Sequence, residues 1–172
     1  MFEIEVLGDK ELVRKLDRLA GAALRKLARP AVARAIVPVN KAAKRNAKQY
    51  QETGTLWRSI GRKIKTYGKW DVVWAGVGPR KGFEGVGPDG RRRVPANYAH
   101  LVELGHVIVG KGQKKKRGSW ARSRQVKKLM AAGQVVPARP FLKPALDTQK
   151  PMAMAILTRE IKKRLEQEAR KR

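Results

Sequence analysis

Residues 55–77 decide the fold class, and they read TLWRSIGRKIKTYGKWDVVWAGV. This pattern predicts a short turn of helix followed by a β-hairpin, with the chain reversal at Tyr67, Gly68 and Lys69. The second predicted strand is apolar on both faces, with Trp70, Val72 and Trp74 on one face and Val73, Ala75 and Val77 on the other. Such a strand is usually central or sandwiched. We therefore expect it to lie inside a small antiparallel sheet or between two layers.

A strand and two helices are predicted before this hairpin. Residues 2–7 alternate apolar and acidic side chains, as in a strand with one buried face. Apolar positions recur at helical spacing over about residues 12–20 and again over about residues 22–48. The apolar side of the second helix is supplied by Leu24, Leu27, Ile36 and Val37. Pro30 and Pro38 should start, kink or divide that helix.

Two further helices are predicted after the hairpin. Residues 78–95 are rich in glycine and proline and are expected to form a loop. A short helix is expected over residues 96–105, with Tyr98, Leu101, Val102 and Leu104 on or near its apolar side. A C-terminal helix is expected over residues 148–172. Its apolar stripe would consist of Met152, Ala155, Ile156, Ile161 and Leu165.

The segment between these two helices has the strongest bias in composition. Residues 104–146 contain no acidic side chain, and residues 111–128 alone hold nine Lys or Arg. We expect an exposed basic loop or arm at about residues 107–135. The prediction is a single α+β domain over residues 1–172. It has an N-terminal strand and two helices packed on a small antiparallel sheet, a long basic loop and a C-terminal helix.

Charge and cysteine content limit the classes of function. Forty-one Lys and Arg face fourteen Asp and Glu, which gives a formal net charge of +27. This surplus favours a polyanion or an acidic protein surface as the partner. The chain has no cysteine, which excludes disulfides, thiol nucleophiles and thiolate metal sites. No stretch has the length and hydrophobicity of a membrane span, and the N-terminus does not resemble a signal peptide.

Two motifs suggest a ligand but lack the necessary context. Residues 85–90 match the glycine pattern of dinucleotide-binding proteins, but Pro88 and the basic run after it prevent the helix that this motif requires. His100, Glu103 and His106 lie at positions i, i+3 and i+6, whereas zinc ligands on a helix lie at i and i+4. Gly105 should also end the helix before His106, so the two histidines would point in different directions. No paired carboxylates or nucleophile motif appear. We therefore expect no catalytic, metal-binding or cofactor-binding residues and no cofactor.

Three segments resemble a known family. They read TGTLWRSI at residues 53–60, YAHLVELGH at residues 98–106 and ARPFLKPAL at residues 138–146. In pattern and order they resemble the phage tail-component family typified by gene product ten of Hong-Kong-97-type siphophages, which is similar in role to the minor tail protein Z of lambda. The resemblance covers about residues 2–160. It implies a small α+β virion protein of the neck or the head-proximal end of the tail, built as a ring, with no catalytic residues to carry over.

These motifs also contain the residues that we expect to anchor the fold. The anchors are Thr53, Gly54, Leu56, Ile60, Tyr98, Glu103, Pro140, Phe141 and Pro144. Glu103 is expected to pair with a nearby arginine, and Phe141 is expected to fix the proline-flanked segment before the last helix. The chain departs from the family pattern in two places. His106 stands where threonine is common, and the stretch between the second and third motifs is long and basic.

The leading hypothesis is therefore a non-enzymatic structural protein of the head–tail neck, assembled in the host cytoplasm. Its expected partners are connector or stopper, tail terminator or tail tube subunits, and copies of itself in a ring. Genomic DNA is a further candidate target of the basic loops. The predicted contact residues are Arg91, Arg92, Arg93, Lys114, Lys115, Lys116, Arg117, Arg122 and Arg124. The alternative is a free-standing, non-specific nucleic-acid-binding protein, which explains the charge but not the three motifs.

Overall fold

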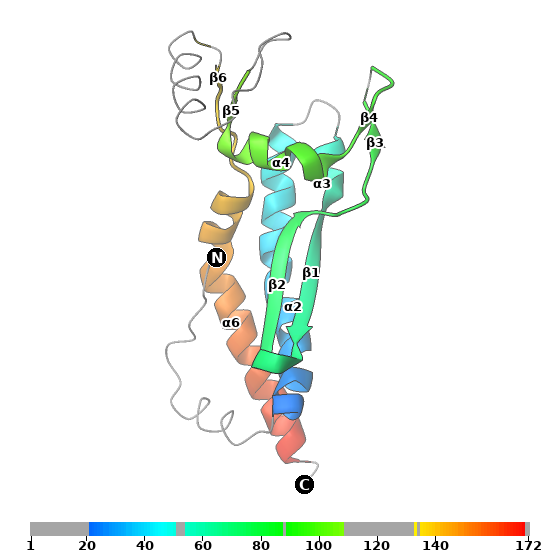
Figure 1. Ribbon diagram of the computed structural model, residues 1–172. Coiled ribbons are helices and arrows are strands. Elements are labelled where there is room, and N and C mark those ends of the chain that lie inside the picture. The colour runs from blue at the N-terminus through cyan, green and yellow to red at the C-terminus, as the bar shows by residue number, and fades with distance from the viewer. Residues whose placement is uncertain (1–20, 51–53, 88, 109–132, 134, 171–172) are drawn as a thin grey trace, which may run out of the picture.

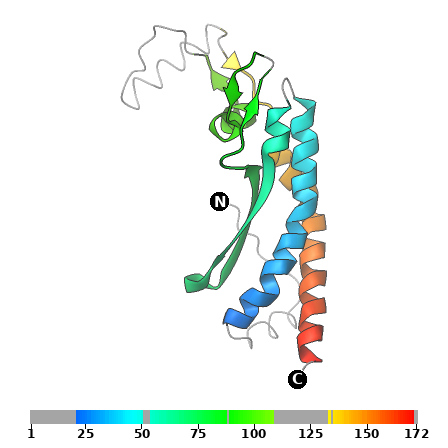
Figure 2. The same ribbon diagram turned by 90° about the vertical axis from the view of Figure 1, so that its right-hand side faces the viewer.

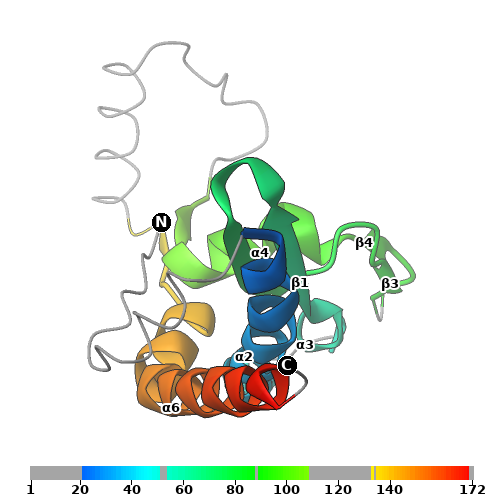
Figure 3. The same ribbon diagram turned by 90° about the horizontal axis from the view of Figure 1, so that it is seen from below.

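A central helix is covered on two sides by other elements. The computed structural model describes residues 21–50, 54–87, 89–108, 133 and 135–170. Helix α2 (Gly21–Gln49) lies between a hairpin of strands β1 (Ile60–Tyr67) and β2 (Val72–Pro79) and the long helix α6 (Leu142–Ala169). Figures 2 and 3 show these three layers from two directions. The 29 residues of α2 make it about 43 Å long, so its two ends are well separated.

Smaller elements gather at the end where α2 finishes and α6 begins (Figure 1). They are the helices α3 (Thr55–Ser59) and α4 (Pro95–Leu104) and the short strands β3 (Gly85–Val86), β4 (Arg92–Arg93), β5 (His106–Val107) and β6 (Val135–Val136). Strands β3 and β4 pair antiparallel, and so do β5 and β6. The prediction of a loop over residues 78–95 therefore missed a small hairpin. Glycine and proline concealed strands of only two residues each.

Helices α2 and α6 run antiparallel and are in contact at the C-terminal end and in the middle of α2. Asn46 Nδ2 donates to the Phe141 carbonyl at 3.2 Å, and Arg34 forms an ion pair with Glu160 at 2.7 Å. The buried stripe of α2 is made mainly of small residues: Leu27, Ala31, Ala35, Val39, Ala42, Ala43 and Ala47. Small side chains let two helices approach closely. The larger apolar residues expected on this face, apart from Leu27, are only half-buried.

The two prolines do not divide α2, since the helix is continuous from Gly21 to Gln49 with Pro30 and Pro38 inside it. A proline inside a helix removes one backbone hydrogen bond and crowds the preceding turn. Packing against α6 and against the hairpin stabilises the helix despite that loss. The prediction of a helix over about residues 22–48 is confirmed, and the expected division is wrong.

The β1–β2 hairpin confirms the predicted strands and refines their turn. Gly68–Trp70 form a 3-10 helix, η1, and Asp71 follows in the left-handed region with a φ of 51°, which aspartate tolerates better than most residues. Arg25 of α2 pairs with Asp71 and donates to the Gly68 carbonyl at 3.3 Å. Arg62 Nη1 donates to the Ala33 carbonyl at 3.0 Å. These contacts fix the whole hairpin to α2.

Among the described residues, only one face of the hairpin is covered. The inner face packs on α2 and carries Ile60, Ile64, Val73, Ala75 and Val77. Val72 and Trp74 lie on the outer face and are exposed, and Trp70 is exposed in the turn. Within the described residues β2 pairs with β1 alone. The expectation that β2 is central or sandwiched is therefore wrong for this part of the chain, because its outer apolar residues are not in a protein layer.

Helix α6 begins at Leu142, six residues before the predicted start at residue 148. The prediction placed Pro144 in a proline-flanked segment before the helix, but proline is tolerated in the first turn of a helix. Three residues assigned to the apolar faces of helices are instead exposed: Leu104 by 76% at the end of α4, and Met152 by 56% and Ala155 on α6. The α+β class is confirmed. The predicted strand over residues 2–7, the helix over residues 12–20 and most of the basic arm lie outside the described residues.

Candidate functional site

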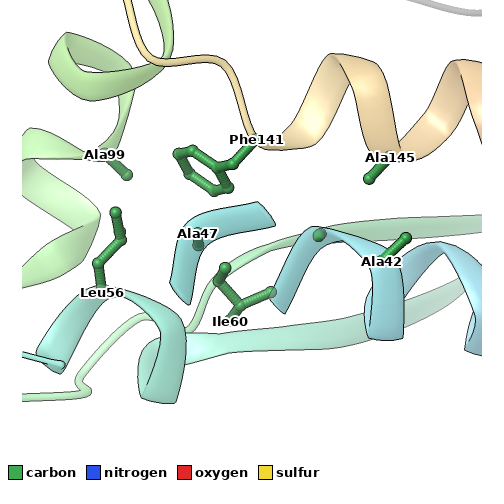
Figure 4. Close-up of a cluster of buried hydrophobic side chains, with 8 residues drawn as sticks. Ala42, Ala47, Leu56, Ile60, Ala99, Phe141 and Ala145 are labelled. Carbon is green, nitrogen blue, oxygen red and sulfur yellow. The ribbon is translucent and has the colours of Figure 1, made fainter. Parts of the chain in front are cut away.

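The three motifs meet in one junction at the C-terminal end of α2. Figure 4 shows Leu56 and Ile60 of the first motif, Ala99 of the second and Phe141 of the third around Ala47, with Ala145 of the third motif opposite Ala42. Phe141 has no exposed surface, and Ile60 has 1%. Segments distant in sequence thus share one apolar cluster. The expectations that Leu56, Ile60 and Phe141 anchor the fold are in agreement with this burial.

Glu103 is the main polar residue of this junction. The backbone amides of Phe141, Leu142 and Lys143 donate to its carboxylate at 2.8, 3.0 and 2.9 Å. The next residue, Pro144, has no amide to donate. Every backbone donor from the N-cap through the third residue of α6 is therefore either bound to Glu103 or absent, so the first turn of this helix is fully satisfied.

The role expected for Glu103 was therefore wrong. Instead of pairing with an arginine, as expected from the sequence, Glu103 lies on α4 and caps the first turn of α6. Phe141 is the N-cap residue of α6, and its side chain cannot accept a hydrogen bond. A carboxylate at a helix N-terminus also interacts favourably with the helix dipole. One side chain of the second motif thus fixes where the helix of the third motif begins.

Further contacts connect the motifs pairwise. The hydroxyls of Thr55 and Tyr98 lie 3.1 Å apart, and the Arg139 amide donates to the Val102 carbonyl at 2.8 Å. Gly105 ends α4 with a φ of 71°, and a Cβ at this position would lie 2.7 Å from the Val136 carbonyl oxygen. Only glycine fits both this backbone and this contact. Of the expected anchors, Gly54 precedes α3, Pro140 precedes the capped turn, and Thr53 lies outside the described residues.

A cavity of about 240 Å³ lies beside the junction. Its described lining is Tyr50, Gly54, Leu56, Arg93, Tyr98, Val102, His106, Val136, Pro137 and Arg139. His106 Nδ1 is buried there without a partner among the described atoms, and Arg139 lies 5.9 Å from the centroid of the Tyr50 ring. His100 is exposed on α4, whereas His106 is half-buried in β5. The described residues contain no group of three His, Asp or Glu that could hold a metal ion.

The three consecutive arginines predicted as contact residues lie on the β3–β4 hairpin and are paired with carboxylates. Arg92 binds Glu84, whose hydrogen bond raises the pKa of the Arg92 guanidinium above its usual value. Arg91 and Arg93 both lie close to Asp89, at 3.9 and 3.3 Å. Desolvation raises the pKa of Asp89, but the Arg91 amide and the Arg93 side chain outweigh it and lower this pKa below its ordinary value.

The structure does not bring the predicted basic residues into one site. Residues 114–117, Arg122 and Arg124 lie outside the described residues. The described basic side chains are spread over the surface of both long helices and the β1–β2 hairpin, and most of them are exposed. No helix in the described ranges has the length and apolar character needed to cross a membrane.

Sequence reasoning missed the roles of Glu103 and Asn46. The cap could have been suspected from two signals: residues 139–141 offer no Ser, Thr, Asp or Asn to cap α6, and Glu103 is the one acid of a short helix that has no Lys or Arg. Which acid serves which helix depends on tertiary packing. Asn46 gave no signal, because an amide side chain in a basic helix is ordinary.

Comparison with known proteins gives one match. Residues 10–105 match the family described as "Bacteriophage HK97-gp10, putative tail-component". No curated protein and no solved structure matches the chain. The matched range includes α2, the β1–β2 hairpin and α4, and thus the first motif, the second motif up to Gly105, and Glu103 itself. The chain belongs to this HK97 gp10-like family of bacteriophage tail components.

Proposed function

We propose that the chain is a structural protein of the head–tail neck of a tailed phage, where it helps complete the tail or join it to the head. The observation that carries this proposal is family membership over residues 10–105. The arrangement of the motifs supports it, because the polar side chains at their junction, Glu103 and Asn46, are engaged in fixing helices. A role in assembly requires no reactive group. The proposed protein is a non-enzymatic, single-domain virion component at the head–tail junction, with a basic arm at about residues 107–135.

The proposed partners are other virion proteins and copies of the chain in a ring. The ordered basic surfaces suit acidic faces of neighbouring connector, terminator or tube subunits. Arg91, Arg92 and Arg93 support protein docking over DNA binding, since their charge is partly neutralised by Glu84 and Asp89. The arm between residues 111 and 128 has no such acids and is the better candidate for contact with genomic DNA.

Imaging of intact virions tests the neck assignment. A labelled chain should appear at the head–tail junction in a fixed copy number, and phage lacking it should accumulate unjoined heads and tails. A position elsewhere in the virion would contradict the proposal. A free-standing nucleic-acid-binding protein, which the net charge of +27 favours, would be absent from particles and would coat DNA without defined stoichiometry.

The DNA contact is tested separately by gel shift with salt titration. Reversing the charges of residues 114–117 should weaken duplex binding strongly at low salt and reduce its dependence on salt. The same number of reversals on the exposed face of α2, at Lys26, Arg29, Lys41 and Arg45, is the matched control. Equal losses in the two variants would contradict a specific role for the arm.

A further inference from the structure

The outer face of the β1–β2 hairpin combines exposed aromatic rings with lysines. We define the outer hairpin face as Lys63, Lys65, Tyr67, Trp70, Val72 and Trp74. Tyr67 pairs across the strands with Val72, and Lys65 with Trp74, so these four side chains share one side of the sheet. Trp70 in the turn is 66% exposed, and Trp74 is 45% exposed. Exposed apolar side chains gathered on one face make that face a candidate interaction site.

The rings on this face are held in position. A Cβ at Gly76 would lie 2.3 Å from the Trp74 ring, so the absent side chain at Gly76 leaves room for the indole to lie along the strand. The rings of Tyr67 and Trp70 are 6.1 Å apart. Lys65 Nζ lies 6.0 Å from the Tyr67 ring, and Lys69 Nζ lies 5.8 Å from the Trp70 ring. Such contacts stabilise the rings before any partner binds.

The face is also presented on a fixed support. Arg25 ties the turn to α2 through Asp71 and the Gly68 carbonyl, and Arg62 ties the middle of β1 to the Ala33 carbonyl. The carboxylate of Asp71 is the acid nearest in sequence, and Arg25 neutralises it. Within the described residues, the outer hairpin face therefore presents apolar rings beside lysines that form no ion pair with a carboxylate. A preorganised surface loses less conformational entropy on binding.

Double-stranded DNA does not match this chemistry. Phosphate contacts require only cations, and the faces of the bases are stacked inside the duplex, so three aromatic rings would gain no apolar partner. A protein surface can satisfy both features. Aromatic side chains are enriched at the centre of protein interfaces, and charged groups lie at their rim.

A second copy of the chain is a poor match by charge. In the described part of the chain, the carboxylates of Asp71, Glu84, Asp89, Glu103 and Glu160 are already bound to arginines or to backbone amides. Few described acids are left to meet the lysines of another copy. The net charge of +27 over the full sequence further disfavours a second copy and favours a different protein with an apolar patch surrounded by carboxylates.

We propose that the outer hairpin face docks the chain onto another virion protein, at a surface that is apolar in the centre and acidic at the rim. This inference rests on the proposed function, because the partner is sought in the assembled particle. It assigns the docking contact to the end of α2 opposite the motif junction. The aromatic rings supply the buried area, and Lys63, Lys65 and Lys69 supply the charge complementarity.

Photo-cross-linking in virions tests the docking surface directly. Benzoylphenylalanine in place of Trp74 is irradiated in purified particles, and the cross-linked peptides are identified by mass spectrometry. The expected product joins position 74 to a different virion protein, within a segment that contains Asp or Glu. The same probe in place of the exposed Met152 on α6 is the control and should not give that product. A product with another copy of this chain, with DNA, or with no protein overturns the inference.

A substitution at the same position provides a second, independent test of the inference. Trp74→Ala should fold as the wild type does by thermal unfolding, yet its copy number in particles should fall about tenfold, as expected for an aromatic hot spot. Met152→Ala should be incorporated normally. Normal incorporation of a folded Trp74→Ala variant overturns the inference. Absence of the wild-type chain from particles would instead refute the proposed function, so the two failures are distinguishable.

Discussion

The two ends of α2 use their side chains in opposite ways. At the C-terminal end, Phe141 is fully buried and Glu103 accepts three backbone hydrogen bonds, so apolar and polar groups are satisfied within the chain. At the N-terminal end, Trp70 and Trp74 remain exposed beside lysines. The first end explains how the fold is held together. At the second end, exposed aromatic rings and lysines remain available to contact another protein, as an assembly contact requires. Substitutions in the buried junction should therefore lower the stability of the fold, whereas substitutions on the exposed face should impair assembly.

Phe141→Ala should have the largest effect on stability. Phe141 fills the centre of the junction, and truncating a buried Phe to Ala typically lowers the free energy of unfolding by about 3–5 kcal/mol. Urea unfolding followed by circular dichroism measures the loss. Phe83→Ala is the matched control, since Phe83 is half-buried beneath Arg80 and should cost clearly less. Equal losses would show that the junction is not the main core.

Glu103→Ala should cost about 2 kcal/mol, because three amides at the start of α6 lose a charged acceptor. Glu103→Gln retains an oxygen acceptor and should fall between the alanine variant and the wild type. Removing any acid from a chain of charge +27 also increases repulsion, so Glu166→Ala, an exposed acid on α6, serves as the charge control. If Glu166→Ala is equally destabilising, the cap contributes nothing beyond net charge.

Both ends could be predicted in part from the sequence. The hairpin, its turn near Gly68, helix α4 and the buried positions of Leu56, Ile60 and Phe141 follow from local periodicity, which reports which face of an element is dry. The sequence could not show that the alanines of α2 are more deeply buried than Ile36 and Val37, because the burial of a small residue depends on how closely α6 approaches. Glu103 and the amides that it caps are about forty residues apart in sequence, so no local pattern connects them. Because the chain is rich in arginine, an ion pair is the simpler expectation for an acid. The exposed outer face of β2 was predicted as buried, because hydrophobicity alone cannot distinguish a core from a docking surface.

The ion pair between the layers predicts a specific dependence on pH. The hydrogen bond from Arg34 lowers the pKa of Glu160 below its ordinary value of 4.5. A carboxyl group whose pKa is lowered by folding contributes stability above that ordinary value, and the contribution is lost as the pH falls through the pKa in the folded state. Arg34→Gln should therefore be less stable than the wild type at neutral pH, and the difference should close as the pH falls well below 4.5.

Urea unfolding at a series of pH values measures this difference. Arg29→Gln removes the same charge from another exposed position on α2 and should show no such convergence with the wild type. A constant difference between Arg34→Gln and the wild type across the acid range would mean that Glu160 is not the partner through which Arg34 stabilises the fold.

Trp70→Ala should have the smallest effect on stability and is the sharpest test of the contrast. Trp70 is 66% exposed, and in the described part of the chain its ring contacts are with Tyr67 and Lys69 of the same hairpin. Its removal should therefore change the free energy of unfolding by less than about 0.5 kcal/mol. Trp57→Ala is the matched control, because Trp57 packs against the buried cluster and should cost clearly more. If Trp70→Ala and Trp57→Ala lowered the free energy of unfolding equally, the tip of the hairpin would belong to the core of the fold. A stable Trp70→Ala protein that is poorly incorporated into particles would instead show that a large aromatic residue at this end serves assembly, since its contribution to folding alone would be too small to explain the loss.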